Sequence, residues 1–516
     1  MESRFDTSLR AGFDSGALGF THDGLVVVRD AAKLQLKDRV AVNAMYVQNT
    51  LRHFTFEREE SGIADTVFFD DKQTLGWVKW TRLLGPETFV KTNLSRVQDV
   101  LRANATGTDP IAVDANVYND SLRVDLSHTP QTGTAWDTGV YLNRASFVLT
   151  GKVGDFRQFT PGVAIGGDPN LPLTELFPSR SFWVGAGYGQ YKYTLRERLT
   201  VQPGLRISWN DATHEVNVGP RLNVALRVGE RHVLKGAWGL FHQPPFNPIL
   251  LDPTFGNPDL TSEQAVHWVA GYEGEPLGTT GPFVKVEAFW KDVFDQVMPQ
   301  DFSTVDFANP QPDDFEKLDK PFLNEGRSTA YGFEVSASRQ LARRIRAELN
   351  YSWLKIRTTN PLLENEAART FSPYFDQRHT ANLVMNWRPD DAWTLSATGR
   401  FGSGKPFTPV RSFRVEDDVS NDAGPRNVWV PDELGPVNSA RYPAYARLDL
   451  RAERAWRWRE RRVIGYVELL NAQYRTNTEF IAYTAGNPDG QPPEAPKRQD
   501  ISGLPTLPFV GARVEF

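Results

Sequence analysis

The chain has 516 residues, a net charge of −5 and no cysteine, and it carries 32 Phe, 15 Tyr and 14 Trp. The mild negative charge gives no sign of a nucleic-acid partner, and no apolar run approaches the roughly 18 residues that a transmembrane helix needs. A helical membrane protein is therefore excluded, whereas a membrane β-barrel is not, because its strands alternate and its lumen and loops are polar.

The N-terminal segment does not look like a targeting signal. Residues 1–5 are not followed by the apolar stretch of a secretion signal. Strand-like sequence instead starts almost at once, in residues 3–13 and 24–36. The chain is then either cytosolic or a mature or truncated form of an exported protein.

Alternating apolar and polar residues recur along the rest of the chain. In residues 198–209, for example, Leu205, Ile207 and Trp209 alternate with polar neighbours. Segments that alternate in this way over about ten residues have the length and period of a tilted membrane strand. The same pattern occurs in residues 284–290, 333–338, 344–353, 393–401, 463–469 and 507–516.

Tryptophans stand near the ends of several of these segments. A membrane barrel carries girdles of aromatic residues at both lipid–water interfaces, so this placement is what a barrel predicts. The tryptophans concerned are Trp209, Trp290, Trp353, Trp387, Trp393 and Trp456.

The connections between these segments alternate in length, which indicates a barrel with short periplasmic turns and long extracellular loops. A soluble propeller would instead repeat at a constant period, and none is found. About twenty strands are expected, so the lumen would be too wide for its own side chains to fill. Short connections are residues 84–87, 228–231, 388–391 and 457–462; long ones are 155–181, 242–262, 298–323, 357–375, 403–442 and 475–506.

Several motifs follow one another in order from about residue 180 to the C-terminus. They are Gly219-Pro220-Arg221-Leu222-Asn223, residues 235–241, Gly256-Asn257-Pro258-Asp259-Leu260, Asn324-Glu325-Gly326, Asp376-Gln377-Arg378-His379, residues 403–409 and three closing segments, 445–450, 467–474 and 511–516. In this order they resemble the barrel of TonB-dependent outer-membrane receptors, the gated importers of siderophores, cobalamin and some sugars.

The resemblance implies an all-β fold, a transmembrane antiparallel barrel of about 22 strands that spans residues 1–516 as a single domain. It implies binding of a scarce large solute, such as a siderophore, cobalamin or a glycan, in the extracellular loops, without catalysis or a cofactor. Release would follow when the TonB energising complex remodels a plug domain. The other implied partners are outer-membrane lipid and the barrel assembly machinery, and the implied location is the outer membrane of a Gram-negative bacterium.

This sequence departs from the family at its N-terminus, where no plug domain is recognised. A passive wide outer-membrane pore is therefore one alternative function. A soluble all-β carbohydrate-binding protein or enzyme is a second. For an enzyme, the chain offers no HExxH, GxSxG or phosphate-binding glycine motif. Its eight His are scattered, and His379 is expected to have a structural role at the barrel rim.

The candidate sites follow from the barrel interpretation. We expect Lys285, Glu287, Arg346, Glu348 and Arg513 to face the lumen and to contact a plug or water rather than solute. Aromatic loop residues that could meet a solute are Phe246, Phe255 and Trp429. The acidic run 416–422 is either a solvated loop or a Ca²⁺ site. Phe516 is either an assembly signal or a lipid contact, and its strand, residues 510–516, is expected to pair with residues 3–13 to close the barrel.

Overall fold

The structure is a computed structural model, and almost all of its regular backbone is β. It describes residues 14–15, 20–23, 28–35, 38–57, 64–106, 111–130, 133–153, 174–176, 179–245, 248–253, 256–300, 320–418, 426–459, 461–483 and 495–515. In the described part of the chain, two short 3-10 helices, η2 (Pro248–Leu251) and η3 (Glu366–Ala368), lie in the connections between strands. Within these ranges, no helix has the length and apolar character to cross a membrane.

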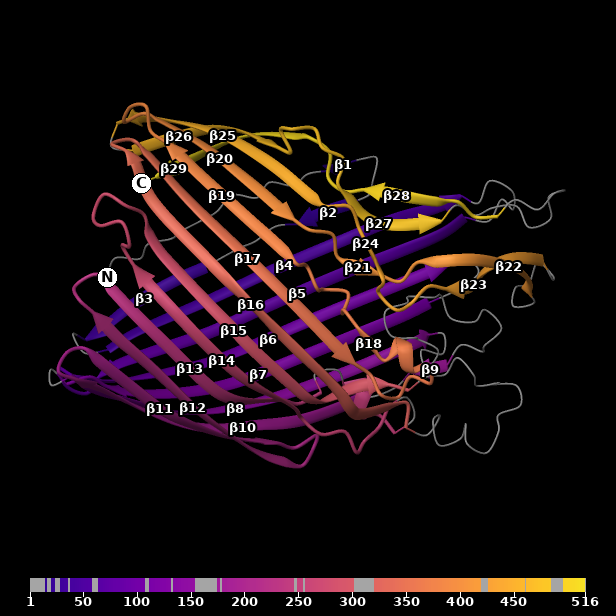
Figure 1. Cartoon of the computed structure of the whole chain (residues 1–516), viewed down its shortest axis with the longest axis horizontal. Coiled ribbons are helices and arrows are strands. Elements are labelled where there is room, and N and C mark those ends of the chain that lie inside the picture. Colours follow the sequence, from indigo (N-terminus) through magenta and orange to yellow (C-terminus); the bar gives the residue numbers. More distant parts are fainter. Residues whose placement is uncertain are drawn as a thin grey trace.

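One antiparallel sheet of 23 strands forms the wall of the molecule (Figure 1). Four strands are short: β1 (Asp14–Ser15), β2 (Phe20–Asp23), β9 (Thr174–Leu176) and β18 (Thr370–Phe371). The other nineteen are β3 (Val28–Gln35), β4 (Asp38–Glu57), β5 (Ala64–Leu83), β6 (Thr88–Thr106), β7 (Ile111–His128), β8 (Thr134–Val153), β10 (Ser179–Leu195), β11 (Leu199–Asn210), β12 (Glu215–Val228), β13 (His232–Gln243), β14 (Glu263–Gly274), β15 (Phe283–Pro299), β16 (Phe322–Ala342), β17 (Ile345–Thr359), β19 (His379–Trp387), β20 (Trp393–Gly402), β25 (Tyr445–Trp458), β26 (Arg461–Leu470) and β29 (Leu507–Glu515).

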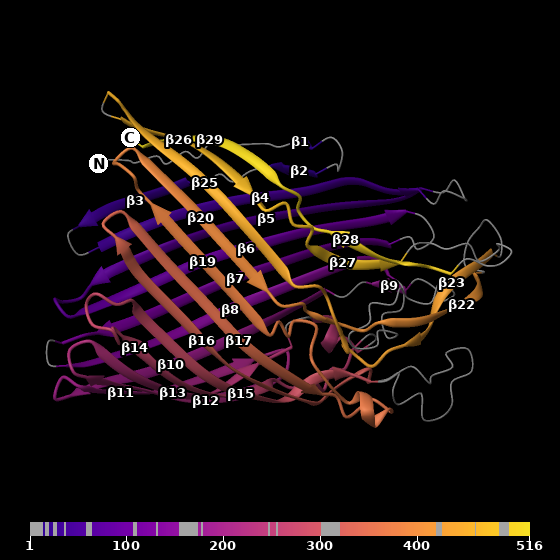
Figure 2. The ribbon, with the colours of Figure 1, turned by 45° about the horizontal axis from the view of Figure 1, so that its top comes forward.

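The long strands form a meander, because each pairs with the next long strand along the chain. Figures 1 and 2 show the strands inclined around a hollow wall whose two ends, β3–β4 and β26–β29, approach one another. Among the described residues no pairing joins β29 to the start of the chain. Residues 3–13 lie outside the described residues, so closure through this seam and the count of 22 strands both stay predictions.

The alternation read from the sequence is present in the wall. Large apolar side chains on one face of the sheet are unusually exposed, among them Leu94 (57%), Val216 (65%) and Val510 (81%). A soluble sheet would bury such a face. An apolar outer face and a polar inner face are what a strand between lipid and a hydrated lumen requires.

An aromatic band crosses four neighbouring strands. Trp238, Trp268, Trp290 and Tyr331 are paired successively across β13, β14, β15 and β16, and the rings of Trp290 and Tyr331 stack at 5.0 Å. Trp353 lies 5.8 Å from Tyr331. The prediction that Trp290 and Trp353 mark strand ends is wrong, because β15 and β17 continue past the aromatic band towards the loops.

The connections fall on two rims. On the turn rim they are short: residues 84–87, 129–133, 196–198, 229–231, 275–282, 343–344, 388–392 and 459–460. On the loop rim most are long: 154–178, 244–262, 300–321, 360–378, 403–444 and 471–506. The predicted alternation is confirmed, with a tight exception on the described part of the loop rim at residues 211–214.

Three small two-stranded sheets, here called the loop hairpins, fold within the long loops, beyond the wall (Figure 1). They pair β21 (Pro406–Phe407) with β24 (Ala440–Arg441), β22 (Val410–Asp418) with β23 (Arg426–Leu434), and β27 (Thr478–Tyr483) with β28 (Arg498–Ser502).

Most fully buried apolar side chains also lie in the loops or near the loop-rim ends of strands. Examples are Leu251 and Leu260 in one loop and Leu363 in another. The loop rim, and not the lumen, therefore contains most of the buried apolar groups of the described chain.

Candidate functional site

The polar face of β15–β19, here called the polar wall, carries two of the predicted lumen residues. Lys285 lies opposite Ser336, and Glu287 lies opposite Glu334. Together with residues of β17 and β19 these side chains line a depression of about 240 Å³. The facing carboxylates of Glu287 and Glu334 repel one another, since like charges directly opposite on neighbouring strands are unfavourable.

Two further predicted residues belong to the same surface. Arg346, Glu348 and Asn350 alternate along β17 on one face, and the Asn350 amide donates to Glu348 Oε1 at 3.3 Å. Arg513 is separate from them, on β29, where its guanidinium lies 3.0 Å from Glu515. Four of the five predicted residues thus lie on the same face of the sheet, on β15 and β17, which are separated by β16.

A cluster that sequence reasoning missed lies on β7 and β10. Arg123 Nε is 2.8 Å from Asp125 Oδ2, and the Tyr188 hydroxyl donates to Asp125 Oδ1 at 2.6 Å. The Tyr188 ring covers Gly139 of β8, where a Cβ would lie 2.6 Å from Tyr188 Cε1. The glycine therefore makes room for the ring that positions the tyrosine hydroxyl on the carboxylate.

A second missed cluster lies on β25 and β26. Arg451 forms ion pairs with Glu453 at 2.7 Å and with Glu468 at 2.8 Å. Its guanidinium also lies 3.9 Å from the centre of the Tyr466 ring, and that ring covers Gly511 of β29. Ion pairs thus join β25 to β26, and the Tyr466 ring extends the cluster over β29.

The sequence does contain a signal for both clusters. Residues i and i+2 of a strand lie on the same face, so a cation and an anion at that spacing can pair along the strand. Lys285 and Glu287 have this spacing. It recurs at Arg123 and Asp125, Arg447 and Asp449, Arg451 and Glu453, and Arg513 and Glu515, all of which form ion pairs.

Replacing Gly139 with alanine is expected to weaken the first cluster. The new Cβ would approach Tyr188 Cε1 (2.6 Å) and Asp125 Oδ1 (2.7 Å), so the ring must move and its hydrogen bond is lost. We expect a loss of about 1–3 kcal/mol in unfolding free energy, typical of overpacking, in urea titrations of the protein in lipid vesicles. Gly187→Ala is the control, because no atom lies within 4 Å of its Cβ position. Equal unfolding midpoints for the two variants would contradict this role of Gly139.

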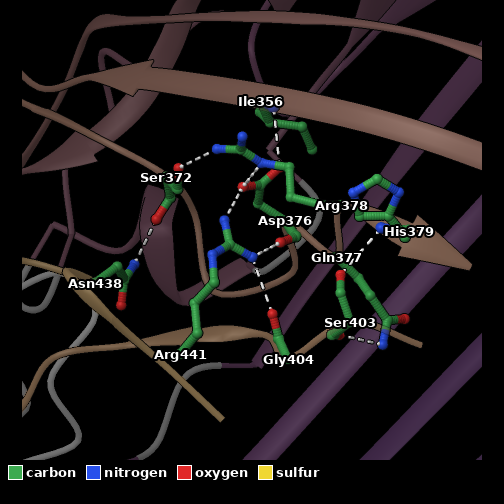
Figure 3. A network of polar contacts seen from close by, with 10 residues as sticks. All are labelled: Ile356, Ser372, Asp376, Gln377, Arg378, His379, Ser403, Gly404, Asn438 and Arg441. Atoms are coloured by element: carbon green, nitrogen blue, oxygen red, sulfur yellow. Dashed lines mark hydrogen bonds and ion pairs between the residues drawn. The ribbon is translucent and has the colours of Figure 1, made fainter. Parts of the chain in front are cut away.

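The loop rim is held by a buried carboxylate, Asp376, whose side chain is fully inaccessible (Figure 3). Its Oδ2 lies 2.6 Å from Arg441 Nη2 and 2.8 Å from Arg378 Nε, and its Oδ1 accepts from the Ile356 amide at 3.0 Å. Arg441 also donates to the carbonyl oxygens of Asp376 and Gly404. We call Asp376, Arg378 and Arg441 the loop anchor.

The loop anchor joins β17 to two separate long loops. Residues 360–378 supply Asp376 and Arg378, and residues 403–444 supply Gly404 and Arg441. Around it, Asn438 Nδ2 donates to the carbonyl oxygen of Ser372, and the His379 amide donates to Ser403 Oγ (Figure 3). The side chain of His379 contacts the Tyr351 hydroxyl at 2.8 Å, which agrees with the structural role expected of it.

A second network of polar contacts fixes the loop that contains the Gly256–Leu260 motif. Asn257 Nδ2 donates to the Phe322 carbonyl oxygen at 2.9 Å, and Lys320 Nζ lies 2.9 Å from Asp259. Asn324 accepts from the Thr261 amide. The motif thus ties the connection before β14 to the start of β16.

Aromatic and cationic groups link the three loop hairpins. Phe413 of β22 lies edge-on to Tyr483 of β27 at 5.1 Å. Phe407 of β21 packs on Tyr442 at 4.9 Å, and the Arg498 guanidinium of β28 lies 5.6 Å from the Phe407 ring. The hairpins therefore form one connected surface at the loop rim.

Of the predicted loop residues, only Trp429 is described. It lies in β23, opposite Val415, and its indole N–H is buried without a hydrogen-bond partner in the described chain. Phe246, Phe255 and Phe516 lie outside the described residues, as does the part 419–422 of the acidic run. Among the described residues, no group of three or more His, Asp or Glu is arranged to hold a metal ion.

The meander, the exposed apolar face, the polar inner face and the unequal rims define a β-barrel of the outer-membrane class. The chain belongs to the TonB-dependent receptor family: residues 9–472 match the family model described as TonB dependent receptor-like, beta-barrel. The resemblance read from the motifs is thereby confirmed. Members of this family are outer-membrane transport receptors. No curated protein matches this sequence.

Solved structures of such receptors share the fold. Pseudomonas aeruginosa FpvA bound to heterologous pyoverdines has a TM-score of 0.65 at 11% identity, over 96% of this chain and 65% of that one. The ferric yersiniabactin uptake receptor FyuA from Yersinia pestis has a TM-score of 0.64 at 12% identity, over 96% of this chain and 71% of that one. The copper transporter OprC has a TM-score of 0.63 at 11% identity, over 96% of this chain and 71% of that one. The chain thus spans about two thirds of the length of FpvA.

Proposed function

We propose that this chain is the membrane-spanning barrel of a receptor for TonB-dependent uptake of a scarce large solute, such as a siderophore, cobalamin or a glycan. The observation that carries the proposal is the loop rim, where long loops are fixed by the loop anchor and meet in one aromatic and cationic surface. Such loops can present a fixed binding surface above a polar lumen.

Among these solutes we favour a metal chelate of the siderophore kind over a glycan. The similar structures are receptors for ferric pyoverdine and ferric yersiniabactin and a copper transporter. Aromatic rings and guanidinium groups at the loop rim suit such solutes, since rings pack on planar apolar groups and arginine binds anionic oxygens. Trp429, whose indole N–H has no hydrogen-bond partner in the described chain, is the loop residue we propose to contact the solute.

We propose further that the polar wall faces a plug domain or water, and not the solute. The carboxylates of Glu287 and Glu334 face one another. A cationic group or water in the lumen would relieve the repulsion between them. All of residues 1–516 are assigned to one barrel domain, and Phe516 to recognition by the barrel assembly machinery. No catalytic step is proposed.

Uptake by cells tests this function. Cells that lack other receptors and produce the protein are expected to accumulate radiolabelled ferric siderophore, cobalamin or oligosaccharide, and to stop when a protonophore removes the energy source. We expect energy-dependent uptake of one of these solutes. Rapid flux of small hydrophilic dyes, unaffected by the protonophore, would instead show a passive wide pore.

A further inference from the structure

Positive charge is concentrated on one arc of the turn rim. The three connections of this arc, residues 343–344, 388–392 and 459–460, contain four arginines and three acidic residues, and the adjoining strand residues 454–458 and 461–462 add four arginines and no acidic residue. The five earlier connections on the same rim, residues 84–87, 129–133, 196–198, 229–231 and 275–282, contain three arginines and four glutamates. We call the arginine-rich part the basic arc; its members are Arg343, Arg344, Arg388, Arg454, Arg457, Arg459, Arg461 and Arg462.

The basic arc is continuous in space. β17, β19, β20, β25 and β26 are successive neighbours in the sheet. The Arg388 amide donates to the Arg344 carbonyl oxygen at 2.8 Å, and the Arg344 guanidinium donates to the Pro389 carbonyl oxygen. Arginines that are more than a hundred residues apart in the sequence therefore lie along one stretch of rim.

Exposed tryptophans accompany these arginines. Trp456 and Trp458 are 45% and 59% exposed, and with Arg454 they alternate along β25 on the same face as the exposed Leu450. The Arg454 guanidinium lies 5.5 Å from the Trp456 ring, and that of Arg459 lies 5.6 Å from the Trp458 ring. This is the apolar outer face, so the rings would lie at the lipid–water boundary.

Carboxylates neutralise only part of this charge. Glu515 lies 3.4 Å from Arg462 and 3.0 Å from Arg513. The Asp390 carboxylate accepts hydrogen bonds from the amides of Ala392 and Trp393. Within the described chain, no ion pair is formed by Arg454, Arg457 or Arg459.

We propose that the basic arc binds the headgroups of anionic phospholipids in the leaflet that surrounds the turn rim. The proposal rests on the membrane location of the proposed function. Guanidinium groups bind phosphate oxygens with paired, charge-assisted hydrogen bonds, and clustered arginines beside a membrane span attract anionic lipid. Trp456 and Trp458 would pack at the level of the headgroups and the upper acyl chains. A small soluble phosphate would use the arginines but would leave the outward tryptophans without a role.

Native mass spectrometry of the full chain in neutral detergent can measure this binding. We expect more retained phosphatidylglycerol than phosphatidylcholine of the same acyl composition. The double variant Arg454→Gln/Arg459→Gln is expected to lower the preference by about tenfold, since each arginine near the headgroups contributes to it. The Arg454→Lys/Arg459→Lys variant, which keeps the charge, is expected to retain most of it.

The matched control is Arg196→Gln/Arg198→Gln, in the turn between β10 and β11. Arg196 and Arg459 both have left-handed backbones, with φ of 49° and 57°, so each pair of substitutions includes one arginine at such a turn position. The control is expected to leave the lipid preference unchanged. An equal loss in the control would show that any rim arginine suffices and would overturn the basic arc.

Two other outcomes would also overturn the proposal. Wild-type protein that retains both lipids equally has no anionic-lipid site. Displacement of the lipid by millimolar glycerol phosphate would indicate a small-phosphate site. Failure of the chain to enter lipid bilayers at all would count against the proposed function, whereas normal insertion without lipid preference would count against the basic arc alone.

Discussion

Replacing Asp376 with asparagine is expected to lower the unfolding free energy by about 3 kcal/mol, the lower end of the cost of breaking a buried ion pair. The carboxylate is fully buried and faces two guanidinium groups at 2.6 and 2.8 Å. A neutral amide in its place would leave both cations without a counter-charge. Arg378 and Arg441 are about a third exposed, so water compensates in part, which is why the lower end applies. Urea titration of the protein in lipid vesicles measures the change.

Glu366→Gln is the control for this prediction, because Glu366 belongs to the same loop. Its carboxylate is 86% exposed and lies 3.6 Å from Arg369, so its removal should cost little. A double-mutant cycle with Arg441→Gln is expected to show strong coupling to Asp376→Asn. Additive effects of the two substitutions would mean that Asp376 and Arg441 do not stabilise the loop rim as a pair.

The loop anchor links stability to the proposed function. It fixes the bases of two loops whose hairpins meet in the surface around Phe407 and Phe413. Loosening those bases would increase the conformational entropy that solute binding must remove. Asp376→Asn should therefore weaken solute binding as well as stability, although Asp376 itself is buried beneath the loops.

The wall could be predicted from the sequence because its cause is local. A strand between lipid and water alternates apolar and polar residues along the chain, so segments such as residues 198–209 became β11 almost unchanged. Strand lengths were predicted less well. The β4, β5, β8 and β16 strands reach 20 or 21 residues, because they continue beyond the part that alternates.

The clusters on the polar face could be predicted only in part, because their contacts depend on register between strands. The pair Arg451 and Glu453 is visible in the sequence at a spacing of two. That Glu468 and Tyr466 complete the cluster follows from the pairing of β25 with β26. Sequence spacing alone does not give that register.

The loop anchor shows the limit of sequence reading most clearly. Residues 376–379 are recognisable as a family motif and as an entry into a strand. The burial of Asp376 depends on Arg441, 65 residues away, and on the Ile356 amide of β17. Only the folded loops bring these groups together, so the motif predicts the position of the residue but not its partners.

Introducing a charge on each face of β12 is expected to show which face meets lipid. Leu222 lies at the centre of β12 on the apolar face and is 39% exposed, and its neighbour Asn223 lies on the opposite face. A charged side chain on the lipid face of a barrel costs about 2–4 kcal/mol near the middle of the bilayer, whereas the hydrated lumen tolerates it. Leu222→Arg should therefore destabilise the protein in vesicles by about that amount, and Asn223→Arg by much less.

The two substitutions introduce the same side chain at adjacent positions of one strand, so the strand propensity and rotamer entropy of the new residue are the same in both. Measuring both variants in lipid vesicles and again in micelles of a short-chain detergent separates lipid from packing effects, because a thin micelle lets the arginine reach water. The difference between Leu222→Arg and Asn223→Arg should shrink in the micelle. If Asn223→Arg were the more damaging variant in vesicles, the apolar face of β12 would have to point into the barrel, and the assignment of the polar wall to the lumen would be wrong.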